Sequence, residues 1–137
     1  MSLAWSMILL VSQTEGGVPP PDEAVDCTEA LTQQAMNRCA AMEWQAADEA
    51  LNVQWRATRQ EMRRLDANVR PEDGRPGYFA QLLSAQRAWL SYRDNHCASV
   101  GYGARGGSLE PLLVANCKTA LTRARMEELR ELAQYPR

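Results

Sequence analysis

The chain has 137 residues, 45% of them hydrophobic, and its 15 basic and 17 acidic side chains leave a net charge of −2. This length allows one modest hydrophobic core and is too short for two ordinary domains. A slightly acidic chain lacks the basic footprint of a general nucleic-acid binder, so we expect no nucleic-acid partner.

Residues 1–21 are expected to be either the remnant of a leader or a disordered tail. Within them, residues 3–11 (LAWSMILLV) form an apolar run that is too short to span a bilayer and is similar to the central region of a secretory signal. No Lys or Arg precedes the run, and no A-x-A cleavage site follows it. The prolines of EGGVPPP then break any helix. We therefore expect a single helical domain over residues 22–137 and no transmembrane segment.

The first predicted helix runs from Thr32 to Leu65 and contains neither glycine nor proline. Its apolar residues recur in steps of three, four or seven, which predicts one helical stripe that other helices must cover. The stripe comprises Met36, Ala40, Trp44, Ala47, Leu51, Trp55, Met62 and Leu65. The Thr32 hydroxyl is the expected N-cap.

Two further helices are predicted, over residues 78–100 and 109–133, after the breaker-rich stretches NVRPEDGRPG and GYGARGGS. The expected inward face of the second comprises Phe79, Leu82, Leu83, Gln86, Leu90, Arg93 and Cys97. That of the third comprises Leu113, Cys117, Ala120, Leu121, Ala124 and Leu132. No strand signal is present, and the connections are short. The sequence therefore predicts an all-α fold, a three-helix up-down-up bundle with one long first helix.

Four cysteines form an even set without a CxxC pair, and the chain has one histidine. Zinc sites need closely spaced Cys/His pairs, so we expect no metal and no cofactor, but two disulfides formed in an oxidising compartment. An up-down-up bundle brings all four cysteines to one end. We favour the pairs Cys27–Cys39 and Cys97–Cys117, with the other two connectivities left open.

Polar residues interrupt the inward faces at helical spacing. They are predicted to form a structural network that fixes the register of the helices, since a buried carboxylate could pair with an inward arginine. The network comprises Asn37, Asp48, Asn52, Gln86, Arg93, Thr122 and Arg125. Asp94, His96 and Cys97 could suggest thiol catalysis, but adjacent helical residues diverge by about 100°, and a disulfide would remove the nucleophile. We expect no catalytic residues and no enzyme.

The loop GYGARGGS is the predicted partner-binding element, through Tyr102, Arg105 and Ser108. It follows a helix and matches neither GxxxxGK[ST] nor GxGxxG, so phosphate binding is disfavoured. Charge is also unevenly placed, with a net of −6 over residues 22–55 and +5 from Arg56 onward. This split could steer a charged partner, or it could be two faces of a bundle that neutralise each other. The arginines at 56, 59 and 63 are interpreted as a solvated face.

Several ordered motifs resemble the LprI-type lysozyme-inhibitor family over residues 26–132. They are DCTEALTQQAMNRCAAMEWQAADEALN, AQRAWLSYRDNHC, GGS and CKTALTRARMEEL. The family pattern T-Q-x-E-M-N-x-C departs here at Ala35, where the acid of a capping box would stand. The leader also lacks a lipobox cysteine.

The resemblance implies a helical, disulfide-bonded protein that is periplasmic or secreted from a bacterium. It also implies a protein partner, with lysozyme the leading candidate. On this hypothesis, the acidic first helix attracts a basic lysozyme, and the loop offers Arg105 to the carboxylates of its cleft. The alternative is a non-catalytic structural or stress-related module of the cell envelope.

Overall fold

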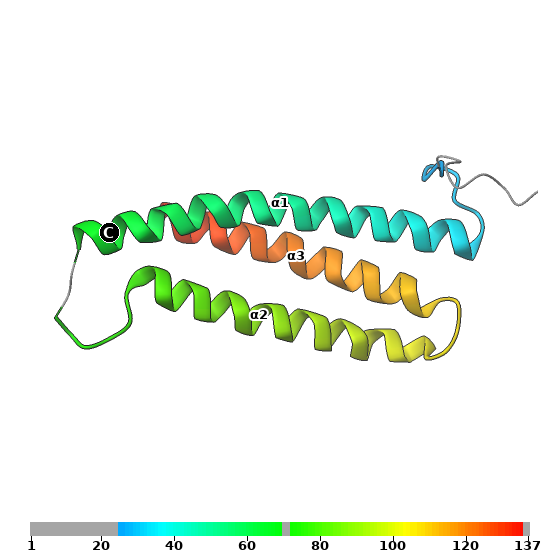
Figure 1. Ribbon diagram of the computed structural model, residues 1–137. Coiled ribbons are helices and arrows are strands. Elements are labelled where there is room, and N and C mark those ends of the chain that lie inside the picture. Colours follow the sequence, from blue (N-terminus) through cyan, green and yellow to red (C-terminus); the bar gives the residue numbers. More distant parts are fainter. Residues whose placement is uncertain (1–24, 70–71, 136–137) are drawn as a thin grey trace, which may run out of the picture.

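The computed structural model describes residues 25–69 and 72–135, so the expectation for residues 1–21 lies outside it. The described part contains helices α1 (Gln33–Asn68), α2 (Tyr78–Gly101) and α3 (Glu110–Gln134), with a short 3-10 helix η1 (Tyr102–Ala104) after α2 and no strand. The three helices lie side by side, with α2 running opposite to α1 and α3 (Figure 1). The all-α, up-down-up prediction is confirmed. In the described ranges no helix is both long and apolar enough to cross a bilayer.

The helix ends lie close to their predicted positions because glycine and proline mark them. The Thr32 side chain accepts a hydrogen bond from the Ala35 N–H at 3.1 Å, which confirms it as the N-cap of α1. Helix α1 continues three residues beyond the predicted end at Leu65, whereas both ends of α2 and α3 fall within one residue of the prediction. Pro111 sits in the first turn of α3, where its missing N–H leaves no helical hydrogen bond unmade.

Helices α1 and α3 run parallel with a constant offset. The Asn37 side-chain amide donates to the Ser108 carbonyl at 2.9 Å, and the Thr58 hydroxyl donates to the Leu129 carbonyl at 2.9 Å. Each pair is separated by 71 residues. These hydrogen bonds fix the register of the two helices at both ends.

The hydrophobic core is concentrated toward the end where α1 turns into α2. Its buried members are Leu51, Met62, Leu65, Leu82 and Leu129, with Trp55, Tyr78, Phe79, Trp89 and Met126 packed around them. Burial of these large side chains supplies the main driving force for folding. The predicted stripe of α1 is therefore confirmed where it contributes Leu51, Met62 and Leu65.

The predicted inward face of α3 is wrong at three of its six positions, whereas Leu113, Cys117 and Leu121 are half-buried. Ala120, Ala124 and Leu132 are exposed, and the buried residues of that helix are Ala115, Thr119, Thr122 and Leu129. On α2, Leu90 is also exposed, at 38%. The reason on α3 is that its buried face includes Thr119 and Thr122. The apolar residues of the helix therefore mark the neighbouring, more exposed face. A buried threonine is tolerated where its hydroxyl is hydrogen-bonded, as for Thr122 beside Arg93.

Candidate functional site

The start of α1, the end of α2 and the start of α3 meet at one end of the bundle, which we call the loop end (Figure 1). Two disulfides lie there, Cys27–Cys39 and Cys97–Cys117, with Cα–Cα distances of 5.7 and 5.5 Å. The favoured pairing is confirmed. The sulfur of the fully buried Cys97 is bonded to Cys117, so it cannot serve as a thiol nucleophile.

The connection between α2 and α3 is a tight loop rather than a flexible one. Gly106 has φ 77°, which favours glycine, and its N–H donates to the Glu110 carboxylate at 2.7 Å. The Gly107 N–H donates to the Ala104 carbonyl at 2.8 Å. At Gly101, a Cβ atom would lie 2.5 Å from Val114, so only glycine lets α2 approach α3 this closely. Hydrogen bonds and the nearby disulfide therefore brace the loop on both sides.

Two predicted partner-binding residues are displayed on this loop. Tyr102 is 55% exposed, and the Arg105 guanidinium carbon lies 4.6 Å from its ring centroid. The exposed Arg105 makes no ion pair in the described ranges, so its charge is open to a partner's carboxylate. Ser108, the third predicted residue, has a different part in the structure, since its carbonyl accepts the hydrogen bond from Asn37.

A groove of about 560 Å³ runs beside the loop. Its floor and walls come from α1, the loop and the first turns of α3, including Trp44, Gly106, Gly107, Glu110, Pro111 and Lys118. One wall is therefore backbone of the loop itself, and the rim carries one acidic and one basic side chain. This arrangement could receive a side chain of a bound protein.

Beneath the loop end, Arg93 forms the centre of a charged cluster. Its side chain is only 7% exposed and contacts Asp48 at 3.1 Å and Asp94 at 3.0 Å. The same guanidinium donates to the Thr122 hydroxyl at 3.4 Å, and Lys118 approaches Asp94 at 3.4 Å. Burial acts to raise the pKa of Asp94, but the hydrogen bond and charge of Arg93, helped by Lys118, outweigh it and lower that pKa.

Two tryptophans separate the cations of this cluster, which together with the two rings we call the charged layer. The Lys118 Nζ atom lies 4.5 Å from the Trp44 ring centroid. The guanidinium carbon of Arg93 lies 5.8 Å from the Trp44 ring centroid and 5.1 Å from that of Trp89. Arg125 then lies 5.9 Å from Trp89. Three cations and two indole rings thus alternate across the bundle, which stabilises the buried positive charge.

Most of the predicted polar network is brought together. Asp48, Arg93 and Thr122 are in contact, and Asn52 donates to Asp48 at 3.2 Å. A second group joins Gln86 to Arg125 at 3.0 Å. The remaining predicted member, Asn37, makes its hydrogen bonds elsewhere, with Gln33 and with the Ser108 carbonyl. It therefore braces the loop and not the network.

Four members of this layer were not anticipated: Trp44, Trp89, Asp94 and Lys118. Trp44 is predicted only as an apolar member of the α1 stripe, and no cation is predicted beside either tryptophan. No ion-pair partner is predicted for Asp94, yet the long side chain of the preceding Arg93 bends back to it. Lys118 is the single lysine in a chain whose other basic residues are arginines, and this exception is the one sequence signal that could have identified it as a functional residue. His96, the single histidine, is exposed and stacks on Tyr92.

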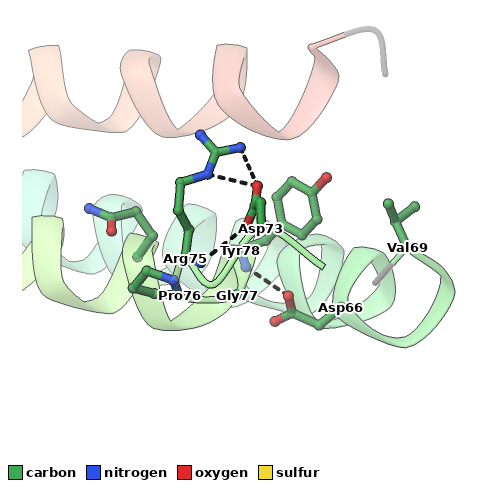
Figure 2. A pocket seen from close by; sticks show the side chains of 8 residues that line it. Asp66, Val69, Asp73, Arg75, Pro76, Gly77 and Tyr78 are labelled. Carbon is green, nitrogen blue, oxygen red and sulfur yellow. Dashed lines mark hydrogen bonds and ion pairs between the residues drawn. The ribbon is translucent and has the colours of Figure 1, made fainter. Parts of the chain in front are cut away.

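The opposite end of the bundle has a hollow of about 570 Å³ (Figure 2). There the Asp66 carboxylate accepts hydrogen bonds from the N–H groups of Tyr78 and Phe79, at 2.7 and 3.0 Å, and so caps α2. Arg75 folds back onto Asp73, and its hydrogen bond lowers the pKa of that carboxyl (Figure 2). The charged groups of this hollow satisfy one another or the backbone. We therefore interpret this hollow as a structural contact between the end of α1 and the start of α2, and place the candidate site at the loop end.

Comparison with known proteins places the chain in a family. A family model described as lysozyme inhibitor LprI matches residues 26–129. An uncharacterized protein of Rhizobium meliloti (strain 1021) is 42% identical over 110 residues, which cover 80% of this chain and 79% of that protein. No solved structure matches the chain. The matched residues include both disulfides, all of α1 and α2, and the loop between α2 and α3. The chain therefore belongs to the LprI lysozyme-inhibitor family.

Proposed function

We propose that this protein is an extracytoplasmic, non-catalytic inhibitor that binds a lysozyme through the loop between α2 and α3. The observation that carries the proposal is a disulfide-braced loop that displays Tyr102 and an unpaired Arg105, in a member of a lysozyme-inhibitor family. The two disulfides favour an oxidising location, periplasmic or secreted, where a lysozyme would be met.

The chemistry of the target explains why an arginine would suit this position. A lysozyme cleaves its substrate between two carboxyl groups, and the one in the more polar surroundings stays ionised. A guanidinium can bind a carboxylate with two parallel hydrogen bonds. Because Arg105 stacks on Tyr102, part of its conformational freedom is already restricted before binding.

Charge near the loop supports the approach of a basic partner. In the first half of α1 the acidic side chains of Glu43 and Glu49 are exposed, with Glu43 4.0 Å from the exposed Arg123, and Arg38 is the one basic residue before Arg56. Such a patch speeds the encounter with a positively charged protein, and the effect weakens as salt is added. The acids of α1 would then steer the lysozyme, and the loop would occupy its cleft.

The test is a cell-wall lysis assay with c-, g- and i-type lysozymes and a micromolar excess of purified protein. We expect one type to be inhibited, and Arg105→Ala to weaken inhibition by about thirtyfold, as for a central interface arginine worth roughly 2 kcal/mol. The matched control is Arg56→Ala, an exposed arginine on α1 that should leave inhibition unchanged. If none of the three types is inhibited, the proposed function is wrong.

A further inference from the structure

Two half-buried side chains, one from α1 and one from α3, hydrogen-bond the backbone of the loop that displays Arg105. The Asn37 side-chain amide on α1 donates to the Ser108 carbonyl at 2.9 Å. The Glu110 carboxylate on α3 accepts from the Gly106 N–H at 2.7 Å. Both contacts act on the backbone just after Arg105, on two different helices. Together they fix the part of the loop that carries its guanidinium.

The orientation of the Asn37 amide is set within the first turns of α1. The Gln33 side-chain amide donates to the Asn37 Oδ1 atom at 2.8 Å. An amide group has an acceptor oxygen and a donor nitrogen, so a partner on the oxygen leaves the nitrogen for the other side. The Asn37 nitrogen is therefore directed to the Ser108 carbonyl. The donor that reaches the loop is thus already oriented by α1.

Glu110 has a second consequence for Arg105. It is the first acidic residue after Arg105 in the chain, five positions later, and an acid this close could neutralise the guanidinium. Its carboxylate is instead engaged with the Gly106 N–H, and Arg105 makes no ion pair with any residue that the structure describes. Gly101 makes room for this arrangement, because a Cβ atom there would lie 3.3 Å from the Glu110 Cγ atom.

We propose that Asn37 and Glu110 are positioning residues for Arg105. They hold the loop in the conformation that binds the partner, and Glu110 leaves the Arg105 charge uncompensated. The inference rests on the proposed function, since the partner is the lysozyme whose carboxylate Arg105 would bind. Both residues act through the loop backbone. A loop that is ordered before binding loses less conformational entropy when it binds, so each hydrogen bond contributes to affinity.

The first test is hydrogen exchange at the Gly107 N–H, followed by NMR. This group donates to the Ala104 carbonyl within the loop, so it reports loop order without contacting either positioning residue. Asn37→Ala and Glu110→Ala should each speed the exchange at least about fivefold, because each removes one hydrogen bond that holds the loop. Glu110→Gln keeps an acceptor for the loop and should exchange like wild type. Asn52→Ala, which removes a hydrogen bond within α1, is the matched control and should also leave the rate unchanged.

A dependence on pH separates positioning through a donated hydrogen bond from a merely structural role. At neutral pH, Asn37→Asp places a carboxylate against the Ser108 carbonyl, and exchange at Gly107 should be as fast as in Asn37→Ala. Below about pH 4 the carboxyl group becomes protonated and can donate again. Exchange relative to wild type at the same pH should then slow for Asn37→Asp. Asn37→Ala has no donor to regain and should show no such recovery.

The second test is the lysozyme that wild type inhibits in the lysis assay. Asn37→Ala and Glu110→Ala should each weaken inhibition about fivefold, the size expected for one hydrogen bond that orders a binding loop. Glu110→Gln should inhibit as well as wild type does. Circular dichroism must show that every variant is folded.

Two outcomes overturn the inference. The first is unchanged exchange at Gly107 in both alanine variants, whether or not a lysozyme is inhibited. The second is faster exchange together with full inhibition, because loop order would then not contribute to binding. A wild type that inhibits no lysozyme overturns the proposed function instead, and the exchange rates and their pH dependence then decide the positioning of the loop on their own.

Discussion

At the end of the bundle where α1 turns into α2, large apolar side chains such as Met62, Leu65 and Leu82 fill the space between the helices. At the loop end the buried residues of α1 and α3 are mainly small, including Ala40 and Ala115. There one disulfide joins α2 to α3, a second ties the segment before α1 back onto that helix, and a charged layer links the helices. The end where α1 turns into α2 supplies stability by burial of apolar side chains. The loop end has little apolar core and holds an exposed loop in position. The loop end should therefore depend on covalent and ionic contacts.

The largest expected effect is at the apolar end. Leu129 is fully buried, and Leu129→Ala should lower the free energy of unfolding by roughly 3 to 5 kcal/mol through lost burial and a residual cavity. Urea denaturation followed by circular dichroism measures the change. Leu132→Ala, three residues later on α3 and at a position 38% exposed, is the matched control and should cost much less. Equal losses would contradict the assigned core face.

The next effect concerns the disulfide that closes the loop. Cys97→Ser/Cys117→Ser opens a bridge of sequence separation 20 and should cost about 3 kcal/mol, mainly because the unfolded chain gains freedom. Cys27→Ser/Cys39→Ser, with separation 12, should cost a similar amount. Trypsin cleavage after Arg105 separates the two variants, since only the first should speed it. Equal cleavage rates in both variants would show that the bridge does not hold the loop.

The same contrast explains what the sequence could predict. Helix ends and the bundle topology follow from local signals, namely the breaker-rich loops and the Thr32 cap. The topology brings the four cysteines to one end, which favours the observed pairs but leaves the other two connectivities open from sequence. The apolar stripe of α1 was correct because its buried positions are largely Leu, Met and Ala.

The errors arise where polar groups replace apolar ones. On α3, Thr122 is correctly expected to face inward as part of the polar network, whereas Thr119 is missed because its hydroxyl gives no apolar signal and its burial depends on the packing of the other helices. The Asp66 cap on α2 was missed because cap and helix are separated by a loop. The charged layer was predicted in part, since inward arginines at helical spacing need partners. Its tryptophans and Lys118 become visible only when three helices are assembled.

A third prediction concerns the charged layer. Arg93→Met keeps the length of the side chain and removes its charge, which breaks the contacts to Asp48 and Asp94. Those carboxylates are 38% and 52% exposed and can be rehydrated, so the cost should be about 1 to 2 kcal/mol, below that of breaking a fully buried pair. Urea denaturation measures it. Adding Asp48→Ala to Arg93→Met should then cost little more, and additive losses would show that the two residues are not coupled.

The smallest expected effect is a dependence on pH that belongs to the loop end alone. In the folded state burial acts to raise the pKa of Asp94, but the hydrogen bond and charge of Arg93, helped by Lys118, outweigh burial and lower that pKa. A lowered pKa means that the contribution is present above the unfolded value of about 4 and is lost as the pH falls through the folded value. Asp94→Asn should therefore reduce the loss of stability between about pH 5 and pH 2.

Because the Asp94 side chain is 52% exposed, solvent screening should keep this difference below about 1 kcal/mol. The measurement is the free energy of unfolding of wild type and Asp94→Asn at several pH values, with Glu49→Gln on the exposed surface of α1 as the control. Added salt should shrink the difference. Parallel pH profiles for wild type and Asp94→Asn would mean that the contacts of Asp94 hold Arg93 in place without stabilising the fold, so that the loop end depends on its disulfides and hydrogen bonds instead.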